Sequence, residues 1–150
     1  TEAIKQVDFD LSKCIAFVTS MAIKTVTKDF NKRMEKHGST RIQWTALYFL
    51  LKADKPMSQK ELAVLMNVQD PSLARLIDRM ERDQLLRRIE NPRDKRVKIL
   101  ELTEAGRSKA EALMPYGQEF SDLLLEDITD EEVENFQRVL KKMLRNIEKR

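Results

Sequence analysis

The stretch from Met57 to Gly106, "MSQKELAVLMNVQDPSLARLIDRMERDQLLRRIENPRDKRVKILELTEAG", is the most informative part of this chain. It holds two short helical patterns separated at Asn67, a residue that tolerates the left-handed backbone of a tight turn. Two strand patterns follow, and the segment that joins them is rich in charge. Two short helices joined by a tight turn form a helix-turn-helix, and a hairpin directly after it forms a wing. The stretch therefore predicts a winged helix-turn-helix.

Capping signals place the two helices. Ser58 to Glu61 fits a capping box, so the first helix is expected to begin there and to continue through Met66. Asp70 is the expected N-cap of the second helix, with Pro71 at its first position. Apolar residues of the second helix recur at i, i+3, i+4 and i+7, the spacing of one buried stripe. They are Leu73, Leu76, Ile77 and Met80.

The other face of the second helix is basic. Its residues are spaced three, four and three apart, and they follow Gln69: Ser72, Arg75, Arg79 and Arg82. The N-terminal residues of such a helix reach base edges in a major groove, and arginine binds both guanine and phosphate. We therefore predict that these five residues contact DNA. On an isolated helix, the same pattern would describe a solvated face.

The predicted wing has strands over Leu86 to Glu90 and Val97 to Leu102, joined by "NPRDKR". The basic residues of this tip are Arg93, Lys95 and Arg96. A narrow minor groove concentrates negative potential, and a guanidinium on a rigid arm can enter it. Asp94 is expected to orient a neighbouring arginine. A charged tip alone is usually a solvated turn, but directly after a helix-turn-helix it predicts contact with nucleic acid.

Helices are predicted before this stretch as well. Residues 8–36 are expected to form one long helix, because apolar residues recur at every third or fourth position. Gly38 is the expected stop. Thr40 then opens a helix to about Lys52 with a capping box. This helix is apolar nearly all round, which predicts a buried central element.

The C-terminal part is also predicted to be helical. Thr103 is expected to cap a helix that runs toward residue 126 and kinks near Pro115 and Gly117. Thr129 opens a final helix with a capping box. The apolar residues of the final helix are spaced 3, 4, 3 and 4: Val133, Phe136, Leu140, Met143 and Ile147. Such a stripe needs a partner surface, either on a second copy of the chain or, as the alternative, within the same chain.

These patterns predict a mainly α fold with a small β-hairpin wing: a winged helix-turn-helix with N- and C-terminal helices, which are dimerisation helices if a second copy of the chain covers their apolar stripes. Residues 8–36 and 104–150 form the expected dimerisation region. Residues 40–103 form the expected DNA-binding region, and the two regions belong to one intertwined domain.

Composition limits the possible functions. The chain has 150 residues, of which 41% are hydrophobic and 35% are charged, and its net charge is +3. Residues 1–98 carry 20 Lys and Arg against 13 Asp and Glu, whereas residues 99–150 carry 8 against 12. This basic excess permits a polyanionic partner. The chain has one His and one Cys, and it lacks a Gly-rich phosphate loop and clustered metal ligands. We therefore expect no enzyme activity, no metal and no cofactor.

The same features bear on location. A single cysteine, Cys14, excludes an internal disulfide framework and suits a reducing cytoplasm. The longest nearly apolar run, "WTALYFLL", is far shorter than the roughly 20 residues of a membrane span. The segment "TEAIKQVDFD" is neither basic nor apolar, unlike a signal peptide. We expect a cytoplasmic protein without a membrane partner.

These motifs together carry a resemblance: Met57 to Gly106 resembles the winged helix-turn-helix of the MarR family of bacterial transcription regulators. Its most specific part is the wing signature Asp94, Arg96, Leu102, Thr103 and Gly106. The resemblance implies a homodimer joined by the first and last helices, base reading by the fourth helix, and a minor-groove contact by the arginine at position 96. The sequence departs from the family at Gln84, where glycine is frequent, and at Ala74, where a hydroxyl residue is frequent.

We therefore expect a sequence-specific DNA-binding transcriptional regulator that binds a pseudopalindromic duplex site as a homodimer. Family members typically repress transcription, so a repressor is expected, although the sequence itself leaves repression and activation open. The alternative is a winged-helix module that binds proteins and has no DNA target.

The resemblance also implies a switch. Family members release DNA when a small molecule or an oxidant acts where the dimerisation and DNA-binding regions join. The candidates for a pocket that takes an aromatic or anionic effector are Phe17, Met21, Trp44, Tyr48, Arg41 and His37. Each of them is also explained as ordinary core or surface. Cys14 is the candidate oxidant sensor, expected about one turn inside the first helix, with a small buried hydrophobe as the alternative reading.

Overall fold

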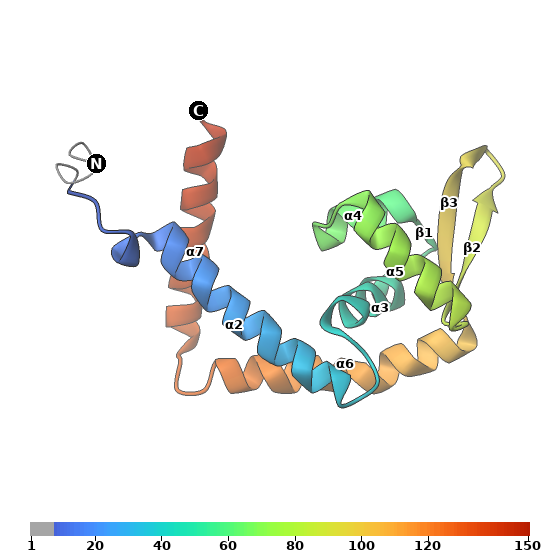
Figure 1. Cartoon of the computed structure of the whole chain (residues 1–150), viewed down its shortest axis with the longest axis horizontal. Helices are drawn as coiled ribbons and strands as arrows, with labels where there is room; N and C mark the ends of the chain where they lie inside the picture. Colours follow the sequence, from blue (N-terminus) through green and yellow to red (C-terminus); the bar gives the residue numbers. More distant parts are fainter. Residues whose placement is uncertain (1–7) are drawn as a thin grey trace, which may run out of the picture. The chain divides into compact units, whose positions relative to one another are not determined.

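A computed structural model describes residues 8–150, so most of the segment "TEAIKQVDFD" lies outside the described residues. The elements follow one another as η1 (Leu11–Lys13), α2 (Ile15–Glu35), α3 (Arg41–Lys52), β1 (Met57–Ser58), α4 (Gln59–Met66), α5 (Asp70–Arg82), β2 (Leu86–Asn91), β3 (Asp94–Leu102), α6 (Glu104–Leu124) and α7 (Asp130–Glu148). Helix α5 leads directly into the hairpin of β2 and β3 (Figure 1). The fold is therefore mainly α with a small antiparallel sheet, as predicted.

The helix-turn-helix is made by α4 and α5. The Ser58 side chain caps α4 by accepting a hydrogen bond from the Glu61 backbone N–H at 3.0 Å. Asn67 ends α4 in left-handed backbone with φ 53°. The predicted N-cap of α5 was wrong by one residue: Gln69 is the extended cap and Asp70 is already helical. The Asp70 carboxylate lies in the first turn, where the helix dipole favours a negative charge.

The wing hairpin belongs to a three-stranded sheet with the order β1-β3-β2. Strand β1 was not predicted; its two residues pair with Leu100 and Ile99. The hairpin strands also reach further than predicted, since Asn91 pairs with Asp94 and leaves a two-residue turn of Pro92 and Arg93. The Asn91 side chain accepts the Arg93 N–H at 2.9 Å, which closes the turn locally. The predicted six-residue tip was therefore too long.

The chain divides into two compact units that meet between Met114 and Pro115, and the main core belongs to the first. The largest fully buried side chains are Met34, Leu47, Leu62, Leu73, Ile77, Met80, Leu86 and Leu100. They come from α2 to α5 and from both long strands. The stripe predicted for α5 is buried in full. Helix α3 is less central than predicted, since only Ala46, Leu47 and Leu50 of it are buried and Tyr48 is exposed.

The N-terminal region departs from the predicted single helix over 8–36. Cys14 has extended backbone (φ −68°, ψ 122°) and separates the short η1 from α2. Asp10 caps η1 by accepting the Ser12 N–H at 3.0 Å. The stop at Gly38 is confirmed, with φ 75° and two Schellman hydrogen bonds: Gly38 N–H to the Glu35 carbonyl and Ser39 N–H to the Met34 carbonyl.

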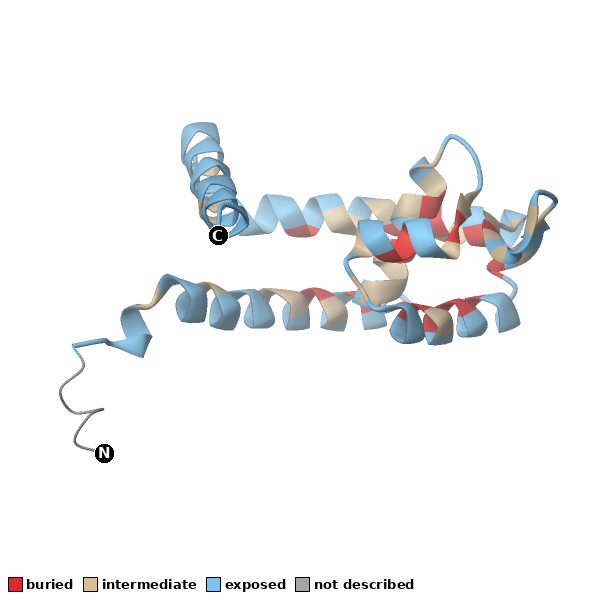
Figure 2. Ribbon diagram, turned by 90° about the horizontal axis from the view of Figure 1, so that it is seen from above, coloured by how far each residue is buried: buried red, intermediate tan, exposed pale blue. Residues whose placement is uncertain are grey.

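Two caps organise the C-terminal elements. The Thr103 hydroxyl accepts the Gly106 N–H at 3.0 Å at the start of α6, which continues to Leu124 through Pro115. The capping box of α7 is complete, because Thr129 accepts the Glu132 N–H and Glu132 accepts the Thr129 N–H. No residue of α7 is buried, and Figure 2 draws the helix almost wholly as exposed. Within residues 8–150, no helix is both long and apolar enough to cross a membrane.

Candidate nucleic-acid interface

Helix α5 presents a basic outer face above its buried stripe. The residues predicted for this face are all exposed, as their spacing predicts: Gln69, Ser72, Arg75, Arg79 and Arg82. No ion pair within residues 8–150 engages the three arginines of this face. Leu76 and Ile77 on the opposite side of α5 are 3% and 0% exposed, so the helix packs against the core. Its guanidinium groups remain available to another molecule. We call these five residues the α5 face.

The wing tip holds one arginine in a defined position. Arg96 donates from Nε to Asp94 Oδ1 at 3.1 Å and from Nη2 to Asp94 Oδ2 at 3.3 Å, and its backbone N–H also binds Oδ1. The expected pairing of Asp94 with a neighbouring arginine is therefore present. The Arg96 side chain nevertheless remains 91% exposed. Arg93 and Lys95 are exposed beside it.

The charge of this pair is also defined. The hydrogen bonds from the Arg96 side chain, and then from its backbone N–H, lower the pKa of the Asp94 carboxyl group below its ordinary value. Asp94 is therefore ionised at neutral pH and keeps its hold on the guanidinium.

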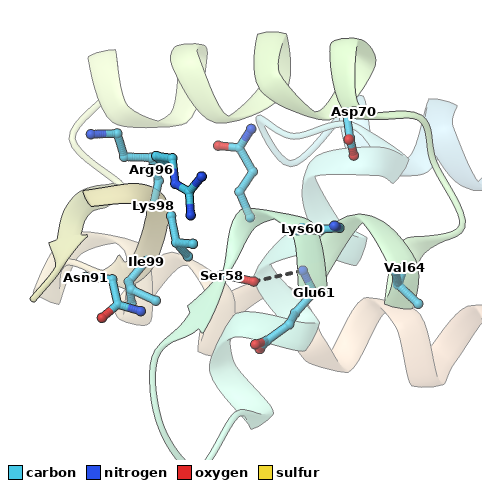
Figure 3. A pocket seen from close by; sticks show the side chains of 11 residues that line it. Ser58, Lys60, Glu61, Val64, Asp70, Asn91, Arg96, Lys98 and Ile99 are labelled. Carbon is cyan, nitrogen blue, oxygen red and sulfur yellow. Dashed lines mark hydrogen bonds between the residues drawn. The ribbon is translucent and has the colours of Figure 1, made fainter. Parts of the chain in front are cut away.

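A groove of about 730 Å³ lies between the start of α4 and strand β3. Figure 3 shows Lys60, Glu61 and Val64 on the helical side and Arg96 and Lys98 on the strand side. Three cationic side chains thus line this groove, and one of them is Arg96 of the wing.

Two of these groove cations, Lys60 and Lys98, were missed by sequence reasoning. Lys98 could have been found, because residues i and i+2 of a strand share a face and Arg96 was already a candidate. Lys60 comes close only through the packing of α4 against the sheet.

The effector candidates are not gathered into one pocket by the described contacts. The Trp44 and Tyr48 rings stack, with centroids 5.8 Å apart, and Trp44 Nε1–H donates to the Leu113 carbonyl at 2.9 Å. Phe17 and Met21 are exposed on α2, 39% and 49%. His37 is exposed just after that helix. Arg41 borders a separate hollow of about 370 Å³, which is lined by Lys24, Thr27, Lys28, Asn31, Arg41 and Ile42.

Cys14 lies at the N-cap of α2 and is half-buried, so its expected place one turn inside the helix was wrong. Asp10 does act as a cap, but of η1, and this leaves Cys14 in the break between the two helices. Across residues 8–150 no group of three or more His, Cys, Asp or Glu residues could hold a metal ion.

A helix-turn-helix with a basic outer face, followed by an arginine-tipped wing, defines a winged-helix regulator. Comparison with known proteins agrees: a model described as "MarR family" matches residues 37–97. The uncharacterized HTH-type transcriptional regulator YwoH of Bacillus subtilis is 31% identical over 125 residues, covering 83% of this chain and 90% of the relative. The chain belongs to the MarR family of transcriptional regulators, and it is accordingly not an enzyme.

Solved structures show the same fold. AbsC of Streptomyces coelicolor, a MarR family transcriptional regulator, superposes with a TM-score of 0.84 at 20% identity, covering 97% of this chain and 99% of AbsC. The S. aureus MepR in its DNA complex gives a TM-score of 0.81 at 23% identity, covering 89% of this chain and 98% of MepR.

Proposed function

We propose that the protein is a transcriptional repressor that binds a pseudopalindromic duplex site as a homodimer. The observation that carries this proposal is the basic α5 face, whose arginines form no ion pair within residues 8–150, beside a wing whose exposed Arg96 is held by Asp94. If these cations were only structural, ion pairs within the chain would be expected to use them. The MepR complex supports the proposal, because there a protein of the same fold is bound to DNA.

The two basic elements have different roles in this proposal. The N-terminal residues of the α5 face, Gln69, Ser72 and Arg75, reach base edges in the major groove. Arg79 and Arg82 follow the same face and contact phosphates, which fixes the register. Arg96, with Arg93 and Lys95 beside it, enters the adjacent minor groove. Asp94 limits the orientations of the Arg96 guanidinium and so lowers the entropy lost on binding.

Uncovered apolar side chains support the homodimer. In the first half of α2, Ile15 and Ile23 are 58% and 56% exposed. In α7, Phe136 and Ile147 are 60% and 71% exposed. Regular apolar stripes of this kind are stable in water when a second copy covers them. We therefore assign residues 8–36 and 104–150 to dimerisation and residues 40–103 to DNA binding.

The symmetry of a dimer then determines the form of the DNA site. A two-fold dimer can place two recognition helices about 34 Å apart, on successive turns of the major groove. Selection of bound duplexes from a random pool tests this directly. We expect an inverted repeat whose half-sites are centred about one helical turn apart. A bound pool without symmetry would contradict the dimeric reading.

The alternative, a winged-helix module that binds only proteins, makes a different prediction about salt. Binding to DNA releases counterions, so affinity must fall steeply as salt rises. A titration of the selected duplex between about 50 and 200 mM salt, where phosphate contacts lose strength, separates the two functions. No binding to any duplex in dilute buffer would favour the protein-binding module.

We further propose that a small aromatic or anionic effector releases the DNA. The stacked Trp44 and Tyr48 rings and the Arg41 side chain supply the matching chemistry. The other candidates are Phe17 and Met21 of α2 and His37 just after that helix. A panel of phenols and aromatic carboxylates should contain compounds that raise the melting temperature and weaken DNA binding. A panel without effect on either quantity would contradict this part of the proposal.

An oxidant signal through Cys14 is the second form of the switch. The thiol lies at the start of α2, in a helix that we assign to the dimer. Peroxide treatment should then weaken DNA binding by the wild-type protein and leave a Cys14→Ser variant unaffected. Equal DNA affinity before and after peroxide would exclude this form.

A further inference from the structure

Arg88 of β2 binds two other elements through one guanidinium group. It donates from Nη2 to Asp78 Oδ1 at 2.6 Å and from Nη1 to Glu81 Oε1 at 3.1 Å, both on α5. Longer contacts of 3.4 Å reach the Ala74 carbonyl of α5 and the Gln59 side chain at the start of α4. The Arg88 backbone N–H also donates to Glu81 Oε2 at 3.1 Å. The recognition helix is thus tied to the wing by one residue.

The degree of burial separates this arginine from its neighbour. The Arg88 side chain is 21% exposed, whereas the Arg87 side chain is 66% exposed and pairs with Glu101 at the longer distance of 3.8 Å. A partly desolvated guanidinium with two carboxylate partners holds its geometry better than a solvated pair does. The chain therefore offers a matched control at the adjacent position.

The partners of Arg88 lie on a defined side of α5. Asp78 and Glu81 are three residues apart, and helical spacing places them on the flank between the α5 face and the buried stripe. Arg88 itself pairs across the sheet with Leu100 of β3, the strand that carries Arg96. The guanidinium therefore fixes how α5 is rotated and how far it lies from the wing hairpin.

We propose that Arg88 is a positioning residue for DNA recognition: it holds α5 and the wing in the one relative geometry that lets both contact the same duplex. This inference rests on the proposed DNA binding. Arg88 itself does not touch the DNA. It acts through the α5 face and through Arg96, and it also keeps two carboxylates of the recognition helix neutralised.

A double-mutant cycle tests the positioning role. The affinity for the selected duplex is measured for the wild type, Arg88→Gln, Arg96→Ala and the double variant. Arg96→Ala alone should weaken binding roughly 5- to 150-fold, the usual cost of one arginine contact. In the Arg88→Gln background the same change should cost about threefold or less, because the wing is already misplaced. The control Arg87→Gln should leave the full effect of Arg96→Ala in place.

If the fold-changes of Arg88→Gln and Arg96→Ala simply multiply, Arg88 does not position the wing and the inference is overturned. A wild type that binds no duplex would instead overturn the proposed function, so the two failures are distinguishable. Circular dichroism and thermal melting show which variants are folded at the assay temperature. If Arg88→Gln is unfolded, the cycle is run with Arg88→Lys, which keeps the charge and loses the planar fork.

A third comparison separates geometry from charge. In Arg88→Gln the Asp78 and Glu81 carboxylates are left unpaired and repel DNA. Adding Asp78→Asn and Glu81→Gln removes that repulsion without restoring the tie between α5 and β2. We expect the triple variant to remain at least about tenfold weaker than the wild type, within the range of coupling between contacting residues. Recovery of wild-type affinity would show that Arg88 acts by neutralisation alone and would overturn the positioning role.

Discussion

Gln84 stands in left-handed backbone, φ 62°, at the C-terminal end of α5. Its N–H donates to the Glu81 carbonyl and the Leu85 N–H donates to the Met80 carbonyl, the two bonds of a Schellman motif. Glycine is usual there because a side chain in this conformation costs about 1–2 kcal/mol. The departure from glycine noted in the sequence is therefore accommodated by a strained residue and not by a different cap.

Replacing Gln84 with glycine should stabilise the fold. We expect the free energy of unfolding to rise by about 0.5–1 kcal/mol, since relief of strain outweighs the extra entropy of glycine in the unfolded chain. Urea denaturation measures this change. The matched control is Asp83→Gly, whose φ of −81° any residue adopts and which should destabilise. A loss of stability in Gln84→Gly would contradict the assigned backbone strain.

The pair of Asp94 and Arg96 gives a prediction about proton binding. Because Arg96 lowers the pKa of Asp94 in the folded protein, the pairing contributes stability at neutral pH. That contribution is lost as the pH falls through the lowered pKa. In Arg96→Ala the pKa of Asp94 should return upward toward its ordinary value, as followed by NMR titration of the carboxyl carbon. An unchanged titration would show that Arg96 does not hold Asp94 in solution.

The pairing of Asp94 with Arg96 could be predicted from the sequence, whereas the contacts of Arg88 could not. Asp94 and Arg96 are two residues apart on one strand, so their meeting follows from strand geometry. The partners of Arg88 are 7 to 29 residues away, and their meeting depends on how α4, α5 and the sheet pack. The prediction therefore included the first pair and missed the second.

Among the elements, those fixed by local signals were predicted best. The caps at Thr40, Ser58 and Thr129 are confirmed, because each needs only a side chain and an N–H three residues on. Strand β1 was missed because its two residues become a strand only by pairing with the distant β3. The break at Cys14 interrupts an otherwise continuous apolar pattern and has no signal of its own.

At Gly106, near its start, helix α6 lies close to the backbone that follows α5. A Cβ atom built there would lie 1.8 Å from the Leu85 carbonyl oxygen, which also accepts the Thr103 N–H. Gly106→Ala should therefore destabilise by about 1–3 kcal/mol, although alanine is the better helix former. Thermal and urea denaturation measure the loss. A more stable variant would contradict the close contact of backbone with backbone.

A substitution in helix α7 tests whether this helix forms the proposed dimer interface. Phe136 is 60% exposed in the single chain, and we assign it to the dimer interface. Phe136→Glu should weaken association by about 2 kcal/mol or more per chain, because an apolar ring is lost and a charge must be buried. Sedimentation equilibrium should show monomers at concentrations where the wild type is dimeric. Asn135→Glu, off the apolar stripe, is the control and should stay dimeric.

In the whole molecule, positive charge is concentrated in the part of the chain that contains the proposed DNA-binding elements. Residues 1–98 hold an excess of 7 basic residues and include the α5 face and the wing, whereas residues 99–150 hold an excess of 4 acidic ones. An acidic C-terminal part repels DNA, which supports the proposal that the basic elements form the binding surface. The proposed dimer would place two such basic surfaces in register on one duplex.

The proposed binding of two chains to one duplex is tested by the stoichiometry of the DNA complex. The mass of the saturated complex with the selected duplex is measured by sedimentation velocity or native mass spectrometry. We predict two chains on one duplex, with no stable complex of a single chain. One chain bound at saturation, or no complex even in dilute buffer, would contradict the proposed dimeric DNA-binding protein.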